Sequence, residues 1–279
     1  MPTTIRVAHS PDSDDAFMFY ALAERKIDTG DLRYEHELSD IESLNHRARR
    51  KELDVSAVSI HAYAYLSQDY ALLASGSSMG DGYGPRLVGR TPAVDARTAA
   101  RGRRIAVPGT LTTAYLALRL WQPDFEAVVV PFDQIEDAVR RGDAELGLLI
   151  HEGQLTYADD GFALWVDLGA WWLSETGLPL PLGGNVIRRD LGDAIMAQVA
   201  RDLKASIVYG LEHRRPALDH AKKFNRGISD ERTDTFVGMY VNDWTVDYGE
   251  RGRRAVQLLL DRAAEAKIIP ERVVVDFVG

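Results

Sequence analysis

The sequence contains no cysteine among its 279 residues. This absence excludes disulfide bonds, a thiolate nucleophile, and zinc or iron–sulfur sites built on cysteine. No His-x-x-His pair and no histidine–aspartate cluster has the spacing of a metal site. The sequence therefore predicts a protein without a bound metal.

Long hydrophobic runs are also missing, and no apolar segment approaches the ~20 residues that span a membrane. The segment Met1–Val7 leads directly into a strand pattern, without the basic and apolar regions of a secretory signal. We therefore expect a cytoplasmic protein with no membrane partner. The net charge of −9 argues against a nucleic-acid partner, which requires neutralisation of phosphates. A small anionic ligand remains compatible, because a local site can oppose the overall charge.

Hydrophobic residues make up 46% of the chain and charged residues 27%, which is ordinary for a folded protein with a large core. Single hydrophobic cores stop growing near ~250–300 residues, so this length predicts about two domains.

A strand–turn–helix pattern occurs twice along the chain. The first copy has a strand at 5–8, a turn at 9–15 and a helix at 16–23. The second copy, at a constant offset of 98, has a strand at 104–107 and a helix from Ala114. The repetition predicts two α/β domains with similar winding.

A capped-helix–strand pattern also occurs twice, at an offset of 91. Ser39 and Glu42 have capping-box spacing ahead of a helix that precedes a strand at 53–60. Asp133 and Glu136 repeat this spacing ahead of a strand at 146–150.

The rest of the chain has less regular signals. Two prolines and three glycines in 176–185 exclude a helix and predict a shaped loop. The other expected elements are a glycine-rich loop at 75–85, strands at 86–89, 161–172, 186–189 and 273–278, and helices at 192–212, 216–225, 230–243 and 249–266.

Crossings between the two domains near 90 and 188 predict three segments. Residues 1–90 form the first part of one lobe, 91–188 form the other lobe, and 189–279 return to complete the first. This is the architecture of two-lobed solute-binding proteins, in which a ligand cleft lies between the lobes.

His151 follows directly after the apolar run 146–150. Ligands of open α/β sheets lie beyond the carboxyl ends of the strands, so this imidazole is a candidate proton acceptor. A surface or capping histidine is an equal alternative. His61 is a weaker candidate, and His213 and His220 are expected to face solvent.

Thr110, Thr112 and Thr113 open a predicted helix. A helix N-terminus with several hydroxyls is suited to a carboxylate or phosphate, whereas an ordinary N-cap needs only one. The matching acidic loop contains Asp12, Asp14 and Asp15, whose carboxylates accept hydrogen bonds from ligand hydroxyls or cap their helix.

Ser56 and Ser59 lie in or at the end of an apolar strand, where Ser59 is a candidate ligand donor and backbone bonding is the alternative. The sequence leaves open whether His61 or Arg86 touches the ligand, and it does not give the oligomeric state.

The chain resembles the 1,4-dihydroxy-6-naphthoate synthases of the futalosine pathway of menaquinone biosynthesis. The residues that carry the resemblance extend over 9–189: His9–Tyr20, Ala57–Ser59, Gly82–Pro85, Thr112–Tyr115, Ile150–Gly153 with Thr156 and Tyr157, and Thr176–Asn185. Many members have Ser-Pro-Cys-Pro-Asn-Asp-Thr-Phe where this chain has Ser10–Phe17, which leaves the role of Asp14 open.

The resemblance implies an α/β, two-lobed, periplasmic-binding-protein-like (type II) fold and a lyase acting on cyclic dehypoxanthine futalosine. It implies that His151 is the general base and that Ala57, Val58, Ser59, Thr112 and Thr113 contact a small-molecule carboxylate substrate. It implies no cofactor. Two alternatives remain: chorismate dehydratase of the same pathway and fold, and a non-enzymatic carboxylate receptor.

Overall fold

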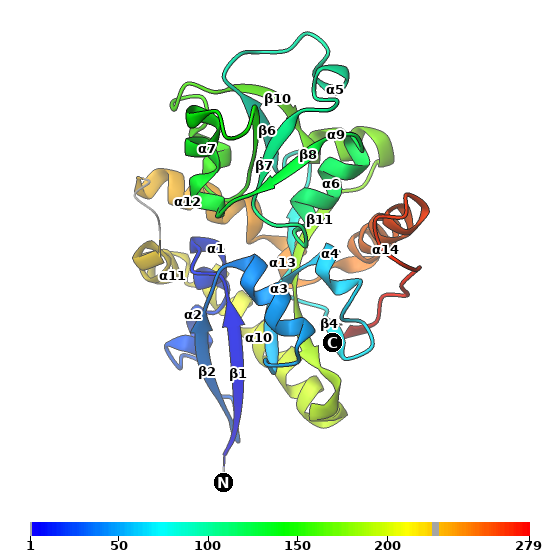
Figure 1. Ribbon diagram of the computed structural model, residues 1–279. Helices are drawn as coiled ribbons and strands as arrows, with labels where there is room; N and C mark the ends of the chain where they lie inside the picture. The colour runs from blue at the N-terminus through cyan, green and yellow to red at the C-terminus, as the bar shows by residue number, and fades with distance from the viewer. Residues whose placement is uncertain (1, 225–228) are drawn as a thin grey trace.

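A computed structural model describes residues 2–224 and 229–279. Two β-sheets lie one above the other, and the chain crosses between them (Figure 1). Helix α12 (Asp230–Tyr240) lies at the junction on one side of the molecule, and α14 (Gly249–Glu265) lies on the other. We call the larger sheet with its helices the large lobe, and the smaller sheet with its helices the small lobe.

The larger sheet has seven strands within the described residues, in the order β12-β4-β11-β3-β1-β2, with β5 paired to β11. Strands β1, β2 and β3 are parallel, and β11 runs antiparallel to β3, β4 and β5. The bounds are β1 Thr3–His9, β2 Leu32–Leu38, β3 Val55–Ser59, β4 Tyr70–Leu73, β5 Ser78–Gly80, β11 Leu180–Arg188 and β12 Phe277–Val278.

The smaller sheet has five strands in the described part of the chain, in the order β10-β6-β9-β7-β8. Strands β7, β8 and β9 are parallel, and β6 runs antiparallel to β9 and β10. The bounds are β6 Arg86–Gly89, β7 Arg104–Val107, β8 Glu126–Val129, β9 Leu146–Leu149 and β10 Ala163–Asp167.

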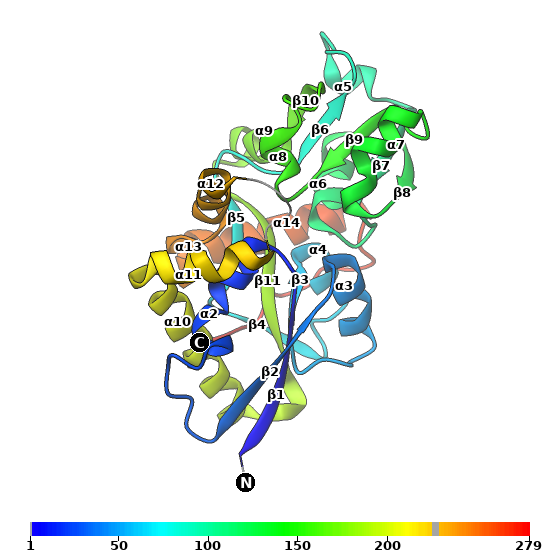
Figure 2. The same ribbon diagram turned by 90° about the vertical axis from the view of Figure 1, so that its left-hand side faces the viewer.

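Helices cover both sheets (Figure 2). The remaining α-helices are α1 Ser13–Met18, α2 Tyr20–Ala23, α3 Ile41–Arg49, α4 Ile60–Tyr63, α5 Ala96–Ala99, α6 Thr113–Trp121, α7 Ile135–Arg141, α8 Gly153–Thr156, α9 Leu168–Thr176, α10 Asp193–Glu212, α11 Arg214–Ala221 and α13 Asp243–Val246. Short 3-10 turns occupy Phe132–Gln134, Arg189–Leu191 and Lys222–Phe224.

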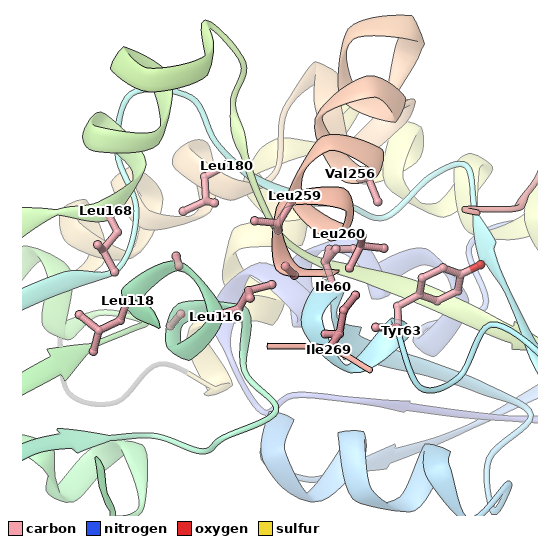
Figure 3. Packing of buried hydrophobic residues seen from close by; sticks show 14 of the residues in the cluster. Ile60, Tyr63, Leu116, Leu118, Leu168, Leu180, Val256, Leu259, Leu260 and Ile269 are labelled. Carbon is pink, nitrogen blue, oxygen red and sulfur yellow. The ribbon is translucent and has the colours of Figure 1, made fainter. Parts of the chain in front are cut away.

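One hydrophobic core is continuous across the junction between the lobes (Figure 3). Ile60 of α4 and Leu259 of α14 belong to the large lobe, and they share this core with Leu116 of α6 in the small lobe. A second core fills the other face of the larger sheet, where Ile5 and Val7 of β1 cluster with Ile207 of α10. Apolar packing therefore joins the lobes on the side of α14.

The strands change sheet between Gly80 and Arg86 and again between Asp167 and Leu180. Both crossings come before the positions expected from the sequence: the first ends at Arg86 and not near 90, and the second ends at Leu180 and not near 188. The division into 1–90, 91–188 and 189–279 remains a proposal for the lobe boundaries.

The prediction of a loop at 176–185 was wrong, because most of this segment belongs to β11 in the middle of the larger sheet. Pro181 is accommodated at an irregular register between β11 and β5, where a missing backbone donor is tolerated. Gly184 is required by close packing, since a Cβ there would lie 2.3 Å from the hydroxyl of Tyr248.

The prediction of one strand over 161–172 was also wrong beyond Asp167. That residue ends β10 and caps α9, because its carboxylate accepts hydrogen bonds from the backbone N–H groups of Gly169 and Ala170 at 3.0 and 3.1 Å. The end of the helix expected at 216–225 and the glycine break at 227 lie at least partly outside the described residues.

Neither predicted capping box forms. Asp40, not Ser39, caps α3 by accepting from the backbone N–H of Ser43 at 3.0 Å. Glu42 instead accepts from the backbone N–H of Leu111 in the small lobe at 3.1 Å. Helix α7 begins without a side-chain cap, and Glu136 pairs with Arg140.

Candidate active site

A cavity lies between the two lobes and encloses about 760 Å³ of space, part of it open to solvent. The six residues selected from the sequence all line it: Ala57, Val58, Ser59, Thr112, Thr113 and His151. The structure therefore brings together residues from β3, the start of α6 and the end of β9.

His151 has an unusual backbone conformation, with a φ of 56° that is rare for a residue other than glycine. This conformation turns the chain after β9, and the imidazole lines the cavity. Strained backbone of this kind clusters at functional sites. The ring lies edge-to-face against Phe132, with a centroid distance of 4.9 Å.

Asp12, in the loop between β1 and α1, reaches the imidazole from the large lobe. Its carboxylate Oδ2 lies 3.1 Å from Nδ1 of His151, and its side chain is only 1% exposed. The same oxygen accepts a hydrogen bond from the hydroxyl of Ser10. Although Asp12 occupies the N-cap position of α1, its side chain makes no capping hydrogen bond.

Two further aspartates line the cavity from the first turn of α1, Asp14 and Asp15. Burial, together with the negative charge of Asp12, raises the pKa of Asp15 to about 7, although its Oδ2 accepts from the backbone N–H of Ser10 at 2.7 Å. Burial raises the pKa of Asp14 well above its ordinary value, and the charges of Asp15 and Asp12 add to this. Asp14 and Asp15 therefore favour their protonated forms, which can donate hydrogen bonds.

Gln154 connects the His151 segment to the large lobe. Its side-chain amide lies 2.7 Å from the hydroxyl of Tyr240 on α12. The amide orientation that satisfies its neighbours also donates to the carbonyl of Gly84 at 2.7 Å and accepts from the backbone N–H of His151 at 3.2 Å. Tyr240 is buried and lines the same cavity.

Arg86 does not line the cavity but contacts the segment that follows His151. Its guanidinium donates to the carbonyl of Gln154 at 2.5 Å and to Asp167 at 3.2 Å. It also lies over the ring of Tyr157. Arg86 therefore holds the backbone that follows His151.

The threonine hydroxyls already have partners within the protein. The hydroxyl of Thr112 donates to the carbonyl of Gly109 at 2.8 Å and, as the N-cap of α6, accepts from the backbone N–H of Tyr115 at 3.2 Å. The hydroxyl of Thr113 donates to the carbonyl of Leu182 in β11 at 2.5 Å and accepts from the backbone N–H of His61 at 3.1 Å. Thr110 is exposed and does not line the cavity.

Ser59 is held by the buried amide of Asn45, which donates to its hydroxyl at 3.2 Å and accepts from its backbone N–H at 2.9 Å. The hydroxyl proton of Ser59 remains available to the cavity. Ser56 is satisfied by the backbone, since its hydroxyl donates to the carbonyl of Ala57 at 2.9 Å. His61 lies behind the cavity wall, and burial lowers its pKa to about 4.

Comparisons with known proteins identify relatives of this chain. A family model described as menaquinone biosynthesis matches residues 5–265. A 1,4-dihydroxy-6-naphthoate synthase of Thermus thermophilus is 40% identical over 93% of each chain. One of Streptomyces coelicolor is 38% identical over 96% of this chain and 95% of its own.

The chain belongs to the 1,4-dihydroxy-6-naphthoate synthase family of menaquinone biosynthesis. This is an enzyme family, and the membership confirms the resemblance drawn from the sequence motifs. A solved structure of a protein from Archaeoglobus fulgidus is 46% identical, with a TM-score of 0.91 over 95% of this chain and 98% of that one.

The fold is shared more widely than the family. The alkanesulfonate-binding protein of Xanthomonas axonopodis is only 12% identical, yet superimposes with a TM-score of 0.68 over 98% of this chain and 96% of its own. This likeness confirms the predicted two-lobed, periplasmic-binding-protein-like fold of the synthase-family chain. No helix in the described residues is long and apolar enough to cross a membrane.

The sequence did not select Gln154, Asn185 or Tyr240, all of which line the cavity. Asn185 is buried, and its side-chain nitrogen donates to the carbonyl of Gly76 at 2.9 Å. Its side-chain oxygen has no partner among the described residues, which makes it a candidate acceptor for a ligand. For Asn185, the only indication in the sequence was its position directly after two glycines.

The segment Gly76–Gly80 has Gly-x-Ser-x-Gly spacing, and its Ser78 lines the cavity. Ser78 begins strand β5, however, and is not at the strand-to-helix turn that exposes a nucleophile in hydrolases. Among the described residues, no group of three histidines or carboxylates has the arrangement of a metal site.

Proposed function

We propose that this chain is the lyase that converts cyclic dehypoxanthine futalosine to 1,4-dihydroxy-6-naphthoate, with His151 as its general base. The observation that carries the proposal is the contact of His151 Nδ1 with the Asp12 carboxylate inside the cavity. A carboxylate only accepts hydrogen bonds, so Nδ1 carries the proton and Nε2 is the nitrogen that can take another.

Among the described residues, the cavity offers no cationic side chain to the substrate carboxylate. No lysine or arginine lines the cavity in the part of the chain that the structure describes. The N–H groups of the first turn of α6, at Thr113 and Ala114, supply the anion site, because such groups lack partners within a helix. The hydroxyl of Ser59 is a further donor nearby.

The acidic loop determines which way the substrate lies. The Asp12 carboxylate disfavours a second carboxylate beside it, so the substrate carboxylate faces α6 and the hydroxyl-bearing, ribose-derived part faces Asp14, Asp15 and His151. Carboxyl groups accept hydrogen bonds from hydroxyls when ionised and donate to oxygens when protonated.

In this orientation His151 removes a proton from the ribose-derived part of the substrate. Cleavage of a carbon–carbon bond then releases the remaining ribose-derived carbons as a second product, to which the proton on His151 can be returned, and aromatisation of the ring system gives the dihydroxynaphthoate. Positioned acid–base catalysis contributes typically ~10²–10⁴-fold to the rate.

The test is incubation of the purified protein with the cyclic futalosine derivative and, separately, with chorismate. We expect 1,4-dihydroxy-6-naphthoate from the first and no change in the second. Dehydration of chorismate would instead assign the chain to the sibling reaction. Binding of either compound without turnover would indicate a carboxylate receptor.

The carboxylate site is tested by comparing the substrate acid with its methyl ester. We expect the acid to bind more tightly, since hydrogen bonds to a charged group are worth roughly 1.5–3 kcal/mol. Equal affinity for acid and ester would contradict a site at the α6 N-terminus.

A further inference from the structure

The contact between Asp12 and His151 joins two lobes. Asp12 follows β1 of the larger sheet, and His151 follows β9 of the smaller sheet, yet the carboxylate and the imidazole are 3.1 Å apart. The side chain of Asp12 is buried, whereas the side chain of His151 is 17% exposed and lines the cavity.

The surroundings of Asp12 direct its carboxylate toward the imidazole. An aspartate at an N-cap normally accepts from backbone N–H groups of the first helical turn, but Asp12 does not. The Ser10 hydroxyl donates to the same oxygen, Oδ2, that faces Nδ1. Ser10 is itself fixed by its backbone N–H, which donates to Asp15 at 2.7 Å.

We propose that Asp12 is a positioning residue for His151, and that closure of the lobes assembles this pair. The carboxylate holds the proton on Nδ1, turns Nε2 toward the substrate, and stabilises the imidazolium that forms when Nε2 takes the proton. Because the partners belong to different lobes, separating the lobes breaks the contact. The base is therefore competent only when the cleft is closed.

This inference rests on the proposed function, in which His151 removes a proton. The loss of a histidine-orienting aspartate lowers turnover because an amide also stabilises the wrong tautomer. For Asp12→Asn we expect kcat to fall by roughly 10²–10⁴-fold while KM changes less than about threefold. Ser10→Ala keeps Asp12 but removes the hydrogen bond that orients its carboxylate, so we expect a smaller loss of kcat.

A double mutant distinguishes action through His151 from independent action. If Asp12 acts through the imidazole, Asp12→Asn with His151→Asn is no slower than His151→Asn alone. Multiplicative losses in kcat would overturn the proposal, as would a change in KM alone for Asp12→Asn.

Asp159→Asn is the matched control. Asp159 of the small lobe pairs with Arg232 of α12 across the same junction, but both side chains are largely exposed and neither lines the cavity. We expect this variant to keep its kcat within about twofold. A loss as large as that of Asp12→Asn would attribute both effects to lobe closure in general and overturn the positioning role.

Nitrogen-15 NMR of the His151 ring provides a readout that does not depend on turnover. With dihydroxynaphthoate bound, we expect a proton fixed on Nδ1 in the wild type and a mixture of tautomers in Asp12→Asn. An unchanged tautomer would overturn the proposal. If the wild type fails to convert the cyclic substrate, the proposed function fails, and the NMR comparison still decides the role of Asp12.

Discussion

The two sheets have the same winding but different chemistry at the cleft. The order β11-β3-β1-β2 in the large lobe matches β6-β9-β7-β8 in the small lobe, with the first strand of each antiparallel and the other three parallel. Each central strand leads into a loop and then a helix at the cavity. Equivalent loops therefore face each other across the ligand site.

The loop after β1 and the first turn of α1 contain three aspartates, and the N-cap residue, Asp12, turns away from its helix toward His151. The loop after β7 contains threonines, and its N-cap residue, Thr112, caps its helix in the ordinary way. One copy thus supplies carboxyl groups and the other supplies a helix N-terminus. A shared scaffold determines where side chains lie, whereas the residue at each position determines what they do.

The residues that follow β3 and β9 also occupy equivalent positions but have different roles. At the offset of 91, His151 corresponds to Ile60, which is fully buried in the first turn of α4. His151 instead has a φ of 56° and lines the cavity. The left-handed backbone moves this side chain from the core to the ligand site.

The largest expected effect on the rate comes from replacing His151. His151→Asn keeps a polar side chain that tolerates positive φ but lacks a proton acceptor of suitable basicity. We expect kcat to fall by roughly 10²–10⁴-fold with little change in affinity or stability. Single-turnover rates with the cyclic substrate, measured beside ligand affinity, check this.

His213→Asn is the control, because His213 is exposed and stacks on Tyr209 far from the cavity lining. It should leave the rate unchanged. If His151→Asn loses only affinity, the imidazole is a binding contact and the base is another residue.

The acidic loop should make stability depend on pH in a way that the threonine loop does not. The pKa of Asp15 is raised to about 7 by burial, so folding favours its protonated form. Its stabilising contribution is fully present below pH ~4 and is lost as the pH rises through about 7.

Asp15→Asn removes this titration but keeps an acceptor for Ser10. Between pH 4 and 8, the wild type should lose a few kcal/mol of unfolding free energy relative to the variant, at about 1.36 kcal/mol per pKa unit. Urea unfolding of both proteins across this range measures the difference. A constant difference would show that Asp15 is ionised in the folded protein.

The sequence predicted much of this comparison, because helix and strand periodicity reflects local burial. The strand–turn–helix repeats and the position of His151 were recognisable in these patterns, and the resemblance to the synthase family selected five further residues of the cavity lining. The sequence predicted a loop where β11 lies. Pro181 and the two glycines lie at a bulge and in close packing against Tyr248, and neither arrangement is evident from the local sequence.

Contacts between the lobes were also beyond the sequence. Glu42 has the spacing of a capping residue yet binds Leu111, 69 residues away. The Asp12–His151 pair and the Gln154–Tyr240 hydrogen bond likewise join segments that become neighbours only after both sheets form. Local patterns predict elements, but pairing across a cleft depends on how the finished lobes meet.

Thr113, the first residue of α6, makes hydrogen bonds that join the lobes. Its hydroxyl bridges the backbone N–H of His61 and the carbonyl of Leu182. Thr113→Val keeps the shape but leaves a buried N–H without an acceptor, which should lower the unfolding free energy by about 1–3 kcal/mol. Thermal or urea unfolding measures this loss.

Thr110→Val is the control in the same loop, because Thr110 is exposed. Exposed substitutions typically change stability by less than ~0.5 kcal/mol. Equal effects at the two positions would contradict a specific role for the Thr113 bridge.

The smallest expected effect on stability comes from Thr112. Its variants distinguish capping of α6 from binding of the substrate carboxylate at the same helix N-terminus. Thr112→Ala removes the cap and should lower the unfolding free energy by ~1 kcal/mol, whereas Thr112→Ser keeps both hydrogen bonds of the hydroxyl and should change it little. If backbone N–H groups bind the substrate carboxylate, Thr112→Ala should lose stability and keep nearly its full preference for acid over methyl ester. A selective loss of affinity for the acid in Thr112→Ala, restored in Thr112→Ser, would show that the hydroxyl leaves its cap to bind the ligand. Calorimetric titration of the acid and the ester with the three proteins distinguishes these outcomes.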